Sequence, residues 1–209
     1  MTSGLRESKK AATRLALARA VLTLATRDGI DAVTIDAVAA EVGVSVRTFH
    51  NYFGGKADAL IHFVSELLDR IVVGTQSRPA DEPFWDSLRI TMCDIITGDD
   101  GVDPAELATL LRMFDSEPAL TTNSGRTELV DTAEERLTTL FADRGLDPDS
   151  LYPHLAFINA LATSRAALEF WANRQDTLTA TARDVLDAAF DQAAAGMTTP
   201  LPVQHTKEK

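Results

Sequence analysis

Residues 34–56 of the chain read TIDAVAAEVGVSVRTFHNYFGGK, and they predict two short helices joined by a glycine turn. Thr34 and Ser45 each precede a helical pattern, where a hydroxyl can accept a hydrogen bond from a free N–H of the first turn. Phe49 and Phe53 are four residues apart, so they share one helix face, and we expect that face to pack inward. The start signals, the turn and the aromatic spacing together predict a capped helix pair.

The outward side of the second helix is unusually polar for so short an element. It carries five hydrogen-bonding side chains, those of Arg47, Thr48, His50, Asn51 and Tyr52. Two helices joined by a short turn that contains glycine form a helix-turn-helix, whose second helix enters the major groove of DNA. The segment therefore predicts a DNA-reading helix pair. The alternative is a pair of core helices in an all-α domain.

The distribution of charge supports a protein of two parts. The net charge is −11 over 209 residues, which as a bulk value argues against DNA. Residues 1–60, however, carry eight Lys and Arg against six Asp and Glu, whereas residues 61–209 carry twelve against twenty-five. A near-neutral head with clustered bases can meet phosphate, while an acidic body is repelled from it. We expect a DNA-binding domain at 1–56 with a basic N-terminal arm, a second domain at 57–197 and a disordered tail at 198–209.

Composition excludes several classes of protein. With 45% hydrophobic and 24% charged residues, the chain is typical of soluble globular proteins. It lacks both a signal-peptide core and an apolar run near the ~20 residues that span a bilayer, so we expect a cytoplasmic protein that does not bind membranes. Its single cysteine, Cys93, excludes an intrachain disulfide and any multi-thiolate metal site. No cofactor or metal is expected.

Hydrophobic periodicity predicts an all-α chain. Apolar residues recur at intervals of three and four throughout, and no segment alternates with the period of a strand. We expect nine to ten helices in total. Besides the pair at 34–56, the predicted helices cover residues 11–27, 57–73, 84–96, 105–114, 125–144, 151–173 and 177–195.

The first ten residues, MTSGLRESKK, are polar and are predicted to be mobile. Arg6, Lys9 and Lys10 make them a small basic arm. Such a segment either frays as an ordinary terminus or reaches DNA phosphates or the minor groove.

The N-terminal part of the chain resembles the tetracycline-repressor (TetR) family of transcriptional regulators. The resemblance covers residues 1–65 and implies an all-α homodimer. In that family three N-terminal helices bind DNA, and six or more C-terminal helices hold a ligand and a dimer interface. The resemblance rests on a set of spaced residues: Leu15, Ala18, Leu22, Gly29, Thr34, Ile35, Val38, Ala39, Val42, Gly43, Val44, Ser45, Thr48, Phe49, Tyr52, Phe53, Lys56 and Leu60.

The same resemblance implies which residues contact DNA. Physical chemistry supports these roles, because Arg47 can pair with guanine through two hydrogen bonds, Asn51 can read adenine and Val46 can touch a thymine methyl group. The full set of expected contacts is Thr34, Ser45, Val46, Arg47, Thr48, His50, Asn51, Tyr52 and Lys56.

Two of these positions are expected at the DNA backbone. Thr34 resembles the residue that meets a phosphate at the start of the second helix, and Lys56 resembles a phosphate clamp just after the recognition helix. Phe49-His50 stands where an aromatic pair with Tyr is frequent in the family. The partner of His50 is therefore left open.

The C-terminal domain is expected to bind an effector. A ligand pocket needs apolar residues with a few convergent polar groups, although each candidate also fits an ordinary core. Arg165 could bind an anionic ligand, or could simply pair with Glu169 four residues further on. The candidates are His62, Phe63, Met92, Met113, Phe114, His154, Phe157, Asn159 and Arg165.

A further resemblance suggests the class of effector. Residues 110–120, LLRMFDSEPAL, are followed by Arg126 and Arg136, and together they resemble regulators that respond to acyl-coenzyme A or other lipophilic ligands. We therefore expect a small lipophilic or aromatic molecule.

The last two predicted helices favour a homodimer. Residues 151–173 carry apolar or small residues on two sides, and residues 177–195 do so similarly, which suits a core on one side and a partner on the other. Two-fold symmetry would match a palindromic operator. We expect a ligand-responsive regulator that is no enzyme, most simply a repressor released from its operator by the ligand.

Other functions are weighed against this one. A helical-bundle enzyme or metal protein is disfavoured, because the paired Glu-x-x-His motifs of di-iron bundles are missing from the sequence. A ligand-independent regulator or an activator stays open.

Overall fold

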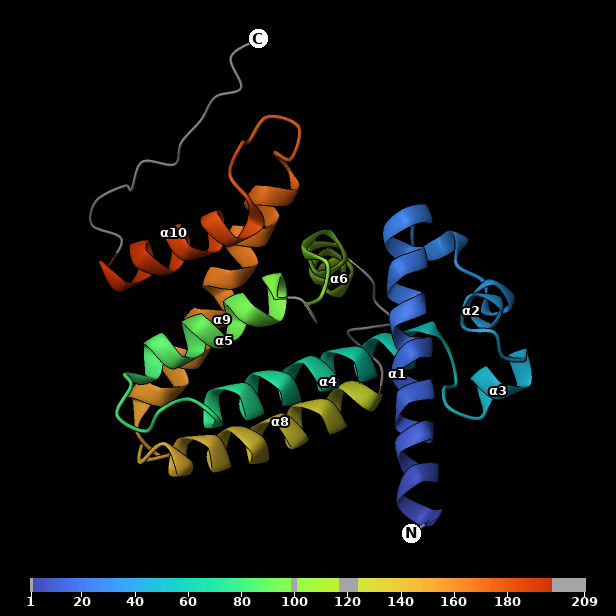
Figure 1. Cartoon of the computed structure of the whole chain (residues 1–209), viewed down its shortest axis with the longest axis horizontal. Coiled ribbons are helices and arrows are strands. Elements are labelled where there is room, and N and C mark those ends of the chain that lie inside the picture. Colours follow the sequence, from blue (N-terminus) through green and yellow to red (C-terminus); the bar gives the residue numbers. More distant parts are fainter. Residues whose placement is uncertain (1, 99–100, 117–123, 197–209) are drawn as a thin grey trace. The chain divides into compact units, whose positions relative to one another are not determined.

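The computed structural model describes residues 2–98, 101–116 and 124–196, which are traced in colour in Figure 1. Within these ranges the chain forms nine α-helices and one short 3-10 helix, and no strand. The predicted all-α fold is confirmed. The elements are α1 (Thr2–Asp28), η1 (Ile30–Ala32), α2 (Ile35–Val42), α3 (Val46–His50), α4 (Lys56–Gln76), α5 (Phe84–Thr97), α6 (Pro104–Ser116), α8 (Ser124–Asp143), α9 (Leu151–Ala172) and α10 (Ala182–Ala194).

The helices are shared between two compact units. The first unit comprises Met1–Leu68 and Thr109–Ala133, and the second comprises Asp69–Ala108 and Glu134–Lys209. Helices α4, α6 and α8 therefore each contribute residues to both units.

The first unit is built on the C-terminal half of α1. This helix packs against η1 and α2, and α2 packs against α3. Leu17, Leu22, Phe49 and Leu60 are among its fully buried side chains. Residues 34–56 are therefore anchored to a well-packed hydrophobic core.

The N-terminal half of α1 is helical where the sequence predicted a mobile segment. The first ten residues were predicted to be mobile, but α1 begins at Thr2 and is continuous to Asp28. Residues 5–12, LRESKKAA, are mostly Leu, Arg, Glu, Lys and Ala, which have high helix propensity. Figure 1 shows this end of α1 running past α2 and α3.

The second unit centres on three mutually packed helices. Helix α9 packs against α5 and α10, and α5 also packs against α10 (Figure 1). Leu88, Leu168, Leu186 and Phe190 are fully buried. These side chains come from all three helices, so the core joins them into one body.

The start of α10 also differs from the prediction. Thr181 accepts a hydrogen bond from the N–H of Asp184 at 3.2 Å, and the Asp184 carboxylate accepts one from the N–H of Thr181 at 2.8 Å. This reciprocal capping box starts the helix at Ala182, not at residue 177 as expected.

No helix in the described part of the chain is long and apolar enough to cross a membrane. The tail predicted at residues 198–209 lies outside the described residues.

Candidate DNA-binding surface and effector region

Two hydroxyl caps and one glycine shape the helix pair. The Oγ1 atom of Thr34 accepts a hydrogen bond from the N–H of Ala37 at 3.2 Å, and Oγ of Ser45 accepts one from the N–H of Thr48 at 3.1 Å. Gly43, between the helices, has a φ of 73°, a left-handed conformation that glycine adopts without steric cost. Both predicted caps and the predicted turn are confirmed.

The aromatic face of this pair packs inward, as predicted. Phe49 and Phe53 are buried, with ring centroids 5.7 Å apart. The ring of His62, on α4, lies 5.7 Å from that of Phe53, and the Arg14 guanidinium lies 5.4 Å from the same ring. Helices α1, α3 and α4 therefore meet at Phe53, which fixes the orientation of α3.

The opposite side of α3 is open. Arg47, His50 and Asn51 are exposed, and Val46, Thr48 and Tyr52 are half-buried. The helix itself ends at His50, and Asn51 forms its C-cap. The side chains predicted to read bases thus lie on a surface that a DNA groove could receive.

Lys56 has contacts that the sequence did not predict. Its Nζ donates to the carbonyl oxygen of Ile30 at 2.7 Å and to that of Val33 at 3.0 Å. Since an ammonium group has three donors, one proton is left for another acceptor. The side chain ties the start of α4 to η1, and its contact with phosphate stays a prediction.

His62, which was predicted to line an effector pocket, lies beside Phe53 in the first unit. Burial, and then the nearby positive charge of Arg14, lowers the pKa of His62 to about 4. The imidazole is therefore neutral at neutral pH. Its Nε2, 3.7 Å from Oε1 of Glu66, forms no ion pair under these conditions.

The nine predicted effector contacts are divided between the two units. Four of them are buried core residues: Phe63, Met92, Met113 and Phe157. Those in the first unit are His62, Phe63, Met113 and Phe114, and those in the second are Met92, His154, Phe157, Asn159 and Arg165. Their contact with an effector stays a prediction.

The polar candidates on α9 have partners within the second unit, and the His154 ring lies 5.1 Å from that of the buried Phe141. His154 and Asn159 are exposed. The Nδ2 group of Asn159 donates to the carbonyl oxygen of Leu155 at 2.7 Å, one turn back on its own helix. Arg165 donates from Nε to Oε1 of Glu169 at 2.9 Å, which confirms the ion pair that was one of its two interpretations.

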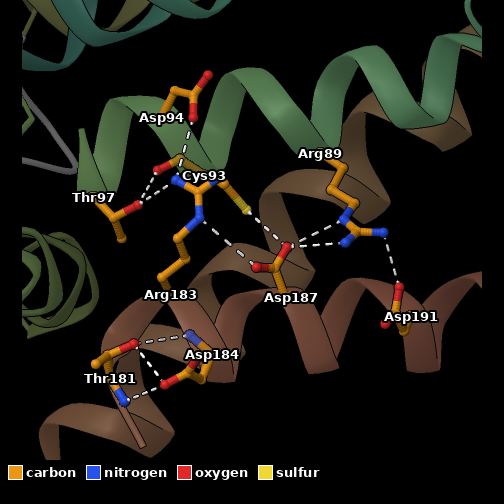
Figure 2. Close-up of polar contacts among 9 residues, drawn as sticks. All are labelled: Arg89, Cys93, Asp94, Thr97, Thr181, Arg183, Asp184, Asp187 and Asp191. Carbon is orange, nitrogen blue, oxygen red and sulfur yellow. Dashed lines mark hydrogen bonds and ion pairs between the residues drawn. The ribbon is translucent and has the colours of Figure 1, made fainter.

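The second unit contains a polar cavity that the sequence did not predict. It lies between α5 and α10 and has a volume of about 450 Å³. Figure 2 shows three of its charged residues, Arg89, Arg183 and Asp187, with their partners on α5 and α10. The lining consists of Glu82, Asp86, Arg89, Ile90, Cys93, Arg183 and Asp187.

The two arginines at this cavity are paired with aspartates. Arg89 donates to Asp187 at 3.0 Å and to Asp191 at 2.9 Å (Figure 2). Arg183 donates to Asp94 at 3.3 Å. The four-residue spacing of positions 183, 187 and 191 on α10 was the available signal, since it places all three side chains on one face. We interpret the cluster as an inter-helix clamp.

Cys93 sits at the centre of this clamp. Its Sγ lies 3.9 Å from Oδ1 of Asp187. Burial, and then the negative charge of Asp187, raises the pKa of the Cys93 thiol to about 11. The thiol is therefore protonated at neutral pH and is a poor nucleophile.

The geometry defines a class of protein. A capped helix pair, packed through its aromatic face and open on its polar face, is a helix-turn-helix of the kind that binds DNA. Residues 17–62 match the family described as "Bacterial regulatory proteins, tetR family", and residues 82–198 match the "MftR C-terminal domain". The chain belongs to the TetR family, and it is a DNA-binding transcriptional regulator.

Individual relatives agree with this assignment. The HTH-type transcriptional regulator TcmR of Streptomyces glaucescens is 27% identical over 197 residues, which are 91% of this chain and 84% of TcmR. The fatty acid degradation regulator FadR of Bacillus halodurans has the same fold, with a TM-score of 0.64 and 16% identity over 89% of this chain and 96% of that one.

A FadR from Bacillus subtilis, solved with stearoyl-CoA, has a TM-score of 0.58 and 15% identity over 86% of this chain and 97% of its own. A FadR from Thermus thermophilus, solved with lauroyl-CoA, has a TM-score of 0.53 and 20% identity over 90% of this chain and 98% of its own. At these identities the likeness shows the fold alone.

Proposed function

We propose that this regulator is a homodimeric repressor that leaves a palindromic operator when a small lipophilic molecule binds it. The proposal assigns DNA binding to residues 1–56, and effector binding and dimerisation to residues 57–197. Such a protein acts on DNA in the cytoplasm and performs no chemical reaction.

The single observation that carries the DNA-binding role is the two-faced α3. Phe49 anchors one face of this helix in the core, while Arg47, His50 and Asn51 stand exposed on the other. A rigid helix with exposed donors and acceptors can read base edges in the major groove. The proposed DNA contacts remain those expected from the sequence.

The homodimer is supported by an exposed apolar surface along α9, which we call the α9 apolar face. Its members are large side chains that a monomer would leave in water, and a contiguous patch of this kind marks an interaction site. The α9 apolar face comprises Leu151, Tyr152, Leu155, Ile158 and Leu161, whose exposed fractions are 71, 54, 47, 61 and 41%.

Helix α10 exposes less apolar surface for a partner than the sequence suggested. Leu178, just before the helix, and Val185 belong to the segment 177–195 that was expected at the interface, but both are buried within the chain. Ala188, Ala189 and Gln192 are half-buried. The proposed interface therefore rests mainly on α9.

The class of effector is suggested by solved structures of the same fold. Two FadR proteins of the same fold hold stearoyl-CoA and lauroyl-CoA. An acyl chain agrees with the lipophilic effector expected from residues 110–120. Control of the operator would require the ligand to favour the released state by ~1–3 kcal/mol.

The test begins with a duplex selected by the protein itself from a random-sequence pool. The complex is then followed by fluorescence anisotropy while lauroyl-CoA, stearoyl-CoA, lauric acid, 1-anilinonaphthalene-8-sulfonate or coenzyme A alone is added. We expect an acyl or aromatic compound to release the duplex and coenzyme A alone to leave it bound. A complex that persists under every lipophilic compound would favour a ligand-independent regulator.

A further inference from the structure

We propose that the N-terminal turns of α1 bind the phosphates of duplex DNA that flanks the bases read by α3. The surface concerned is formed by Arg6, Lys9, Lys10 and Arg14, and we call it the α1 basic face. The inference rests on the proposed DNA binding and adds a second, sequence-independent contact to it.

The four cations share one side of the helix. At about 100° per residue, positions 6, 9, 10 and 14 fall within an arc of roughly 140°. All four side chains are exposed. Glu7 is the only acidic residue from position 5 to position 16. This face is thus a concentrated positive surface on a chain whose net charge is −11.

The local energetics of this segment favour an anionic partner. The N-terminus of a helix carries partial positive charge, so it is stabilised by acidic side chains and opposed by basic ones. The first turn of α1 has no acidic residue, and Arg6, Lys9 and Lys10 follow closely. From residue 5 to residue 16 no side chain is buried, so packing does not offset this repulsion. Phosphate groups would offset it directly.

Arg14 sets the direction in which the basic face points. Its guanidinium lies 5.4 Å from the centre of the Phe53 ring, which follows α3 and packs against Phe49. This contact places one edge of the α1 basic face, at Arg14, beside the segment that follows the recognition helix. The same duplex could contact both.

The length of the exposed segment suits flanking DNA. From Arg14 back to Arg6 the helix rises about 12 Å, at 1.5 Å per residue. Figure 1 shows this part of α1 extending beyond α2 and α3. Cations carried beyond the recognition helix can reach only backbone outside its base pairs, where phosphate contacts add affinity without reading sequence.

The test compares two duplexes and three variants. The duplex selected from the random pool is prepared as a short core, and again with about ten base pairs, one helical turn, added to each end. The main variant combines Arg6→Gln, Lys9→Gln and Lys10→Gln. The control is Arg19→Gln, since Arg19 is exposed on the same helix but lies roughly 220° around it from Arg6. Glu7→Lys adds charge beside the face.

We expect the wild-type protein and the Arg19→Gln control to bind the flanked duplex at least ~10-fold more tightly than the core at about 0.1 M salt. The triple variant should bind both duplexes alike and, because a dimer loses six cations, lower the slope of log affinity against log salt by about five. It should still distinguish the selected core from a shuffled core. Glu7→Lys should bind the flanked duplex more tightly than wild type.

The inference is overturned if the triple variant keeps the wild-type salt slope and preference for flanks while its circular dichroism is unchanged. It is equally overturned if Arg19→Gln loses as much affinity as the triple variant, because the effect would then be one of net charge. Failure of the wild-type protein to bind any selected duplex is a different result, since it contradicts the proposed function itself.

Discussion

Lys56 illustrates how a side chain expected to contact DNA can also hold the fold together. The sequence placed it after the recognition helix as a phosphate clamp, but its ammonium is bonded to the carbonyl oxygens of Ile30 and Val33. These partners are 26 and 23 residues away. No local pattern specifies such a contact, because it depends on how η1 and α4 meet in three dimensions.

The first prediction concerns this tie. Lys56→Ala removes two hydrogen bonds to part-buried carbonyl groups and should lower the free energy of unfolding by about 1–2 kcal/mol. Urea denaturation followed by circular dichroism measures the change. Lys10→Ala, on the exposed turns of α1, is the matched control and should change stability by less than ~0.5 kcal/mol. Equal stability of the two variants would contradict a structural role for Lys56.

The second prediction concerns His62. Its folded-state pKa of about 4 lies below the ordinary 6.5, so the folded protein favours the neutral ring. The resulting stabilisation is fully present above pH 6.5 and is lost as the pH falls toward 4. His62→Phe keeps a ring of similar size without the titration. The stability difference between wild type and this variant should therefore shift by on the order of 2 kcal/mol over that range.

Subtracting the variant cancels the titration of the carboxylates common to both proteins. A difference that does not change between neutral and acidic pH would show that the His62 imidazole is not held neutral by its surroundings.

At the scale of elements, the sequence predicted what local chemistry controls. The caps at Thr34 and Ser45 and the left-handed Gly43 were recognised because each depends on a few neighbouring residues. The start of α10 was missed although Thr181 and Asp184 form a capping box with the usual spacing. The predicted helix began at residue 177, because the apolar spacing of a helix continues across Thr181.

Contacts between elements were harder to predict. The clamp between α5 and α10 joins residues almost a hundred positions apart, such as Arg89 and Asp187. Charge spacing on α10 shows that these side chains share a face, but it cannot name the helix opposite. The sequence therefore could not place the cavity at this point.

The third prediction tests the clamp. Asp187→Asn weakens the acceptor for Arg89 and should lower the free energy of unfolding by about 1 kcal/mol, since these groups are partly exposed. The loss should shrink in high salt because the interaction is screened. Urea denaturation at low and high salt measures both effects. Asp176→Asn, in the exposed segment before α10, is the control, and the clamp interpretation fails if the two variants behave alike.

At the scale of the whole molecule, the sequence did not predict which face of α9 is buried. The helix is apolar or small on most sides, so periodicity could not decide which stripe is buried. A spacing of four places Leu161 and Phe157 on neighbouring parts of the helix surface, yet Leu161 is 41% exposed and Phe157 only 4%. Packing against α5 and α10 determines which side of α9 is buried. The side that remains exposed is the α9 apolar face.

The fourth prediction is that this face holds two copies together. Ile158→Asp places a charge in the middle of the proposed interface and should raise the dissociation constant of the dimer at least ~10-fold, as burying an unpaired charge is costly. Analytical ultracentrifugation measures the constant. Val73→Asp, which alters another exposed apolar side chain (60% exposed), should leave it unchanged. A wild-type protein that stays monomeric at micromolar concentration would contradict the proposed dimer.

The most direct test of the proposed DNA contacts is the ratio of affinities for the selected palindromic duplex and for a shuffled duplex of the same length. Fluorescence anisotropy titrations give this ratio for the wild-type protein and for Arg47→Ala. A lost base contact costs about 1–3 kcal/mol, and a symmetric dimer loses two, so the ratio should fall at least ~30-fold. Affinity for the shuffled duplex should change far less. An unchanged ratio in Arg47→Ala would contradict the assignment of α3 as the element that reads the operator.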